Sequence, residues 1–86
     1  MTTITATDAQ IKETIFRELG KIAPEADFEG LDLKEDVRQV LDIDSFDFLN
    51  FLIALNEAYG VEIPEADYGR LVSVTDIVDY LQARLP

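Results

Sequence analysis

The chain has 86 residues and a formal net charge of −11, and it contains neither cysteine nor histidine. This length predicts a single domain, with an ordered core over about residues 7–85. The missing residue types exclude disulfides, thiolate nucleophiles, the usual zinc sites and a Ser–His–Asp triad. The carboxylates, lysines, tyrosines and hydroxyls that remain are a poor set for an enzyme of this size, so we predict no enzyme and no catalytic residues.

No apolar run reaches the roughly 20 residues that a membrane-spanning helix needs. The first six residues also lack the basic start and the long apolar stretch of a secretory signal. We therefore expect a soluble, cytoplasmic protein without a membrane span.

The negative charge is unevenly distributed. Residues 1–41 carry nine acidic and five basic side chains, whereas residues 42–86 carry nine acidic and two basic ones. Such a surface repels phosphate backbones, so we expect no nucleic-acid partner. Acidity keeps a small protein soluble, and it also favours docking on basic patches of other proteins.

The first predicted helix follows Thr7. Thr7 and Gln10 have the spacing of a capping box, in which each side chain accepts a hydrogen bond from the other residue's backbone. The apolar stripe that follows is Ile11, Ile15, Leu19 and Ile22. Gly20 weakens the end of this helix, and Pro24 ends it.

Residues 23–43 form a long connection. A long connection in a small domain is usually held down by apolar side chains, or it is functional. The candidate anchors are Phe28, Leu31, Leu33, Val37, Val40 and Leu41. A short helical turn is expected at residues 35–41.

The second main helix is predicted to begin at Asp44 or Ser45 and to run to about Tyr59. Gly60 stands where a glycine commonly ends a helix. Asp44 and Ser45 are both residue types that cap helices, and Asp47 in the first turn suits the helix dipole. Capping alone is therefore one interpretation of this stretch.

The remaining residues predict one short helix and one more main helix. Residues 61–64 are expected to be extended, because Pro64 disfavours helix before it. A short helical piece is expected at residues 66–71, and Ser73 opens the last helix. The apolar stripe of that helix is Ile77, Val78, Leu81 and Leu85. The predicted fold is an all-α bundle of three main helices and one short helix, with a long loop between the first and second helices.

Four segments, in this order, resemble the acyl carrier protein family. They are Asp44-Ser45-Phe46-Asp47, Ala-Leu-Asn-Glu-Ala-Tyr-Gly at residues 54–60, Val-Glu-Ile-Pro at residues 61–64, and Ser-Val-Thr-Asp-Ile-Val-Asp-Tyr-Leu at residues 73–81. The resemblance covers residues 41–82 closely and the first helix and the long loop more loosely. Two departures are Asp42, where many members have glycine, and Phe46, where leucine or isoleucine is usual.

The resemblance implies a cofactor and a site. Ser45, flanked by Asp44, would carry 4′-phosphopantetheine from coenzyme A through a phosphodiester, and the thiol of this arm would hold acyl or aminoacyl groups as thioesters. A helix N-terminus suits such a phosphate. The implied partners are a phosphopantetheinyl transferase and enzymes that load or transfer acyl or aminoacyl groups, with basic or apolar docking surfaces. We expect the carrier to be a monomer.

The second helix also predicts a docking face. At about 100° per residue, its outer side is separate from the side that carries Leu52, Leu55 and Tyr59, which should be core. The candidate partner-binding residues are Phe46, Asp47, Leu49, Asn50, Ile53 and Glu57. Packing under the long loop is nearly as good an interpretation for Leu49.

Phe48 lies on the inner side of this helix, at a place where fatty-acid carriers commonly have a small residue. Phe51 adds bulk next to it, and close-packed cores leave little room for a guest chain. We therefore expect a specialised carrier for short, polar or aminoacyl groups, in fatty-acid, polyketide or aminoacyl metabolism, rather than the general fatty-acid carrier. In the other interpretation, these rings only compensate for small residues such as Ala54 and Ala58.

A calcium loop is the alternative for the acidic residues 25–36. An EF-hand prefers aspartate first and a bidentate glutamate last, whereas this segment has Glu25 first and Asp36 last. A solvated acidic loop is favoured, and we expect no metal site.

A hydrolase and an unmodified interaction module are the two alternative functions. A hydrolase that pairs Ser45 with a lysine is disfavoured, because Lys12, Lys21 and Lys34 all precede the second helix without a fixed relation to it. An unmodified acidic helical interaction module is the main alternative, since it would share the fold and the charge of a carrier.

Overall fold

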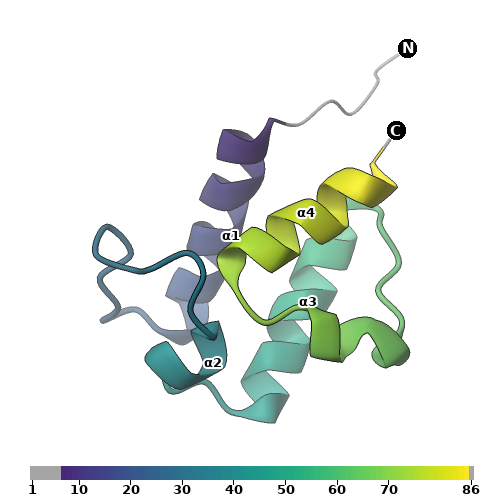
Figure 1. The fold of residues 1–86 in the computed structure, drawn as a ribbon. Coiled ribbons are helices and arrows are strands. Elements are labelled where there is room, and N and C mark those ends of the chain that lie inside the picture. Colours follow the sequence, from purple (N-terminus) through teal and green to yellow (C-terminus); the bar gives the residue numbers. More distant parts are fainter. Residues whose placement is uncertain (1–6, 86) are drawn as a thin grey trace.

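The computed structural model describes residues 7–85, and this part of the chain is helical without a strand. The elements are α1 (Asp8–Ile22), α2 (Val37–Val40), α3 (Ser45–Tyr59), the 3-10 helix η1 (Glu65–Arg70) and α4 (Val74–Arg84) (Figure 1). The predicted all-α bundle is confirmed, with α2 as the short turn expected at residues 35–41. Within the described range, no helix is both long and apolar enough to cross a membrane.

The start of α1 is the predicted capping box. The backbone N–H of Thr7 donates to Gln10 Oε1 at 2.9 Å, and the N–H of Gln10 donates to Thr7 Oγ1 at 3.1 Å. The apolar stripe of α1 then packs against α3 and α4. This cap fixes where α1 begins, and the apolar stripe decides which of its sides meets the core.

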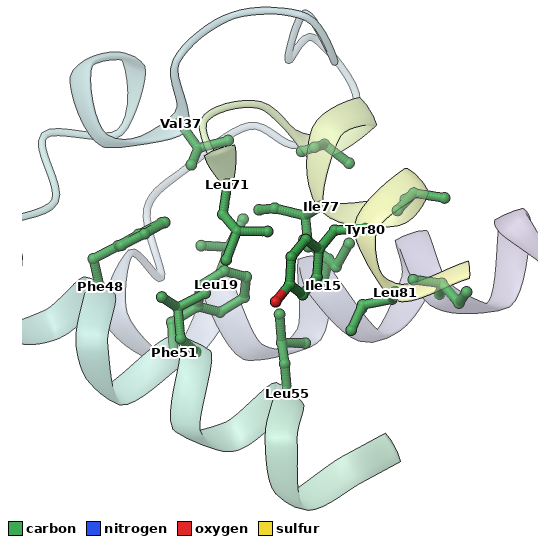
Figure 2. Packing of buried hydrophobic residues seen from close by; sticks show 14 of the residues in the cluster. Ile15, Leu19, Val37, Phe48, Phe51, Leu55, Leu71, Ile77, Tyr80 and Leu81 are labelled. Carbon is green, nitrogen blue, oxygen red and sulfur yellow. The ribbon is translucent and has the colours of Figure 1, made fainter. Parts of the chain in front are cut away.

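One hydrophobic core joins the three main helices, as Figure 2 shows. Its fully buried large side chains are Ile11, Ile15 and Leu19 of α1, Phe51, Leu52 and Leu55 of α3, and Ile77 and Leu81 of α4, with Val37, Leu71 and Val74. Tyr80 is also buried, which the sequence did not predict. Tyr59 was expected in the core but is only partly buried, because its hydroxyl reaches Thr14 Oγ1 at 2.8 Å near the surface.

The long connection is held down as predicted by most of its apolar residues. The Phe28 ring stacks on Phe16 of α1 with a centroid distance of 5.4 Å, and Leu31 is buried. Val40 is an exception: its side chain is 50% exposed, so its prediction as an anchor is wrong. The single turn α2 has one inward side, which Val37 occupies, and Val40 faces solvent.

The remaining predicted ends are close to the observed ones. Gly60 has φ 66° and ends α3 in the left-handed conformation. The piece expected at residues 66–71 is a 3-10 helix at Glu65–Arg70. Ser73 caps α4 by accepting from the Asp76 N–H at 3.0 Å. These ends set the length of α3 and place η1 between α3 and α4.

Candidate functional site

Ser45 is the first residue of α3, and its side chain is exposed. Capping of this helix is done by Asp44, whose Oδ1 accepts from the Asp47 N–H at 2.8 Å. The chain has one other serine, Ser73, which is buried and is occupied as the cap of α4. Of the two residues that the sequence offers as the cap of this helix, Asp44 is confirmed, and the Ser45 hydroxyl does not serve as a cap.

Arg38 of α2 lies beside Ser45. Its Nη2 donates to Ser45 Oγ at 2.7 Å, and its guanidinium carbon is 5.4 Å from the centre of the Phe48 ring. That distance is within the range of a cation–π contact. Sequence reasoning missed Arg38. The available signal was its place in the predicted helical turn, seven residues before Ser45, but the direction of its side chain depends on how the chain turns after α2.

The turn after α2 is a Schellman motif. Asp42 has φ 53°, in the left-handed region. The Ile43 N–H donates to the Arg38 carbonyl at 2.9 Å, and the Asp42 N–H donates to the Gln39 carbonyl at 3.4 Å. This backbone conformation is the one that glycine adopts without strain. It gives a physical reason for the glycine that the resembled family pattern has in place of Asp42.

An open groove of about 330 Å³ begins at Ser45. Its lining residues are Arg38, Ser45, Phe48 and Leu49 on one side and Tyr68 and Gly69 of η1 on the other. A second groove of about 190 Å³ continues along α3, and Tyr68 lines both. Ser45 therefore lines a groove to which η1 also contributes.

Two positive groups lie at Ser45: the N-terminal end of α3 and the Arg38 guanidinium. The first turn of a helix has backbone N–H groups without intrahelical acceptors and a positive dipole end. Arg38 adds a full positive charge next to Ser45 Oγ. Together these groups suit a phosphate at this position.

The predicted docking face points to solvent. Phe46 is 72% exposed, Ile53 is 47% exposed and Leu49 is 37% exposed. Asn50 and Glu57 are also exposed, and Asp47 is partly buried. Phe48 and Phe51 point inward, with their ring centres 5.7 Å apart. The helix therefore separates an apolar outer face from two aromatic rings in the core.

The side chain beside Ser45 is not one of the lysines weighed in the hydrolase alternative. Lys21, for example, pairs with Glu18 on α1 at 3.1 Å. A guanidinium stays protonated and cannot serve as a general base. Within residues 7–85 there is no cluster of three acidic side chains that could hold a metal ion. In the acidic loop, Asp27 Oδ1 accepts from the N–H groups of Glu29 and Gly30.

Comparison with known proteins agrees with this geometry. Residues 9–81 match the model of a family described as "Phosphopantetheine attachment site". The chain is 34% identical over 74 residues to an acyl carrier protein of Helicobacter pylori (strain G27), covering 86% of this chain and 83% of the relative. It is 29% identical over 72 residues to an acyl carrier protein of Campylobacter fetus subsp. fetus (strain 82-40), covering 84% of this chain and 87% of the relative.

Proposed function

Because the chain belongs to the acyl carrier protein family, we propose that Ser45 is the residue to which its 4′-phosphopantetheine is attached. The observation that carries this proposal is the exposed Ser45 hydroxyl at the N-terminus of α3, which is not used as the helix cap because Asp44 serves in that place. The other serine, Ser73, is buried and is occupied as a cap. Ser45 is therefore the serine that a transferase can reach.

A member of this family is a carrier and not an enzyme, and its prosthetic group is covalently attached 4′-phosphopantetheine. The family interacts with phosphopantetheinyl transferase and with acyl-handling enzymes. The arm supplies the thiol that forms the thioester. In the attachment step, Ser45 Oγ loses its proton and forms a bond to phosphorus, while the pyrophosphate bond of coenzyme A breaks and the adenosine part leaves as a bisphosphate.

The cargo belongs to the proposal as well: short, polar or aminoacyl groups rather than long fatty acyl chains. Phe48 and Phe51 fill the inner side of α3, where a guest chain would have to enter the core. The grooves beside α3 are open to solvent, and the one beyond Ser45 measures about 190 Å³. An open groove does not enclose a long apolar chain, whereas a short or polar group needs no such enclosure.

Partner enzymes would dock on the outer face of α3, where one side carries Phe46, Asn50, Ile53 and Glu57, flanked by Leu49 and Asp47. The three apolar side chains of this face are exposed, although exposure costs free energy in water. Asn50, between Phe46 and Ile53 on this side, is polar but carries no charge, so Asp47 and Glu57 are the acidic side chains of the face. Docking should therefore depend mainly on apolar contact.

Intact-mass measurement after incubation with coenzyme A and a broad-specificity transferase tests the carrier function. The expected product carries the mass of one phosphopantetheine arm. A chain that gains no mass, under conditions in which a known carrier is fully converted, would instead be the unmodified acidic interaction module.

A further inference from the structure

We propose that Arg38 binds the phosphodiester that joins the arm to Ser45, and thereby holds the first part of the arm at the mouth of the groove. This inference rests on the attachment at Ser45. It assigns a second residue to the site, on a different helix from Ser45.

The position of Arg38 is the first argument. Its Nη2 lies 2.7 Å from Ser45 Oγ, the atom that becomes bonded to phosphorus. Oxygens attached to that phosphorus are therefore within reach of the guanidinium with little movement. Arginine presents a planar fork of N–H donors that matches two phosphate oxygens at once.

The charge around Arg38 is the second argument. The chain has 18 acidic and seven basic side chains. Even so, within residues 7–85 the ion pairs are made by Arg17, Lys21, Arg70 and Arg84 and not by Arg38. In a protein with this excess of carboxylates, an arginine that contacts a serine hydroxyl instead is available for an anion on that serine.

The same neighbourhood explains why a cation is needed. Asp42, Asp44 and Asp47 all lie within three residues of Ser45. A phosphodiester adds a further negative charge beside them, and the partial charge of the helix N-terminus offsets part of it. Arg38 supplies a full positive charge.

Arg38 is also positioned before any arm is attached. Its backbone carbonyl accepts from Ile43 in the turn that Asp42 closes. Its guanidinium lies over the Phe48 ring, with 5.4 Å between the guanidinium carbon and the ring centre. A side chain that is already placed loses less conformational entropy on binding.

The test compares apo and holo forms of the wild type, Arg38→Gln and Arg17→Gln. Arg17 is an exposed arginine on α1, so Arg17→Gln removes the same charge away from the site. Intact mass first establishes that each protein carries the arm. The two readouts are the ³¹P chemical shift of the phosphodiester and the change in Tm between the apo and holo forms.

We expect the ³¹P resonance of holo Arg38→Gln to move away from the wild-type position, and that of holo Arg17→Gln to coincide with it. The apo-to-holo change in Tm should be less favourable in Arg38→Gln than in Arg17→Gln by on the order of 4 °C, the shift that one lost contact causes in a domain of this size. About 1 M salt should reduce this difference, because it screens charges beyond about 3 Å.

A second measurement needs no variant. In the wild type, the side-chain N–H resonances of Arg38 should shift on conversion from apo to holo, while those of Arg17 stay in place. Unchanged Arg38 resonances, or ³¹P shifts and Tm changes equal in the two variants, would overturn the role of Arg38 while leaving the attachment at Ser45 intact. A wild type that gains no arm would instead refute the proposed function.

Discussion

The hydroxyl of Tyr80 donates a hydrogen bond of 2.6 Å to Oδ2 of Asp67 and so joins α4 to η1. Arg84 lies over the Tyr80 ring, 3.6 Å from its centre, and its Nη2 is 3.5 Å from the same carboxylate oxygen. Since Tyr68 and Gly69 of η1 form one wall of the groove at Ser45, this contact holds that wall in place.

The Tyr80–Asp67 contact predicts a loss of stability at high pH. Burial and the hydrogen bond to Asp67 raise the pKa of Tyr80 above its ordinary value of 10.0. The folded state therefore keeps the proton that the unfolded state loses near pH 10. The resulting stability is fully present below that pH and is lost as the pH rises through the higher folded pKa.

Tyr80→Phe should cost about 1 kcal/mol of unfolding free energy near neutral pH, because it removes one hydrogen bond. It should also make stability fall less steeply above pH 10, the ordinary pKa of tyrosine. Urea unfolding at neutral and alkaline pH measures both effects. Tyr68→Phe is the control and should keep the wild-type alkaline loss; equal slopes for wild type and Tyr80→Phe would contradict this account.

Asp42→Gly should stabilise the protein by about 0.5–1 kcal/mol. A left-handed conformation costs a non-glycine residue on the order of 1 kcal/mol or more, and the greater freedom of glycine in the unfolded chain cancels part of the gain. Asp42→Ala is the matched variant, because it removes the same carboxylate but keeps Cβ at φ 53°. Denaturant unfolding measures the free energy of unfolding of both variants. If Asp42→Ala is as stable as Asp42→Gly or more stable, this turn is not strained.

Local signals were sufficient to predict where the helices begin and end. The Thr7–Gln10 capping box and the left-handed Gly60 are interactions between residues close in sequence, so spacing alone reveals them. The sequence could not decide whether Asp44 or Ser45 caps α3, because both residue types serve. The observed cap is Asp44, so the Ser45 hydroxyl is not used to cap the helix.

Features that depend on packing were harder to predict. Tyr80 can be a core residue because its hydroxyl donates a hydrogen bond to Asp67, thirteen residues earlier in the chain. The sequence predicts Val40 as an anchor, but a single helical turn has one inward side, and Val37 occupies it. The Arg38–Ser45 contact depends on the left-handed backbone conformation of Asp42. The sequence shows Asp42 only as a departure from the family pattern.

The docking face predicts a partner interaction that depends on apolar contact. Phe46→Ala and Ile53→Ala should each reduce kcat/KM of a partner enzyme about fivefold or more, the effect of losing roughly 1 kcal/mol at an interface. Val72→Ala, another exposed apolar residue but outside α3, is the control and should change little. Moderate salt should weaken the interaction only slightly.

Assays of the holo forms at low and moderate salt measure these effects. If kcat/KM falls strongly with salt and neither α3 substitution changes it, the partner recognises charged side chains on another surface.

The inward position of Phe48 predicts that cargo stays outside the core. Forms loaded with short and long acyl chains should have similar Tm values, because neither chain is buried. In Phe48→Leu, which vacates part of the ring volume, Tm should rise with chain length, since an apolar chain can refill the space. Thermal unfolding of matched loaded forms provides the comparison, and a clear rise with chain length in the wild type would contradict the prediction.

The central claim is that Ser45 alone accepts the arm, and the two serines of the chain allow a matched test. Ser73→Ala should lose about 1 kcal/mol of stability, because it removes the cap of α4, yet remain fully modified. Ser45→Ala should keep its stability to within about 0.5 kcal/mol, as is usual at an exposed position, yet gain no mass. The direct measurement is intact mass with fragment mapping after incubation with coenzyme A and transferase. We expect one arm on Ser45 in the wild type and in Ser73→Ala. An arm on Ser45→Ala would contradict the claim.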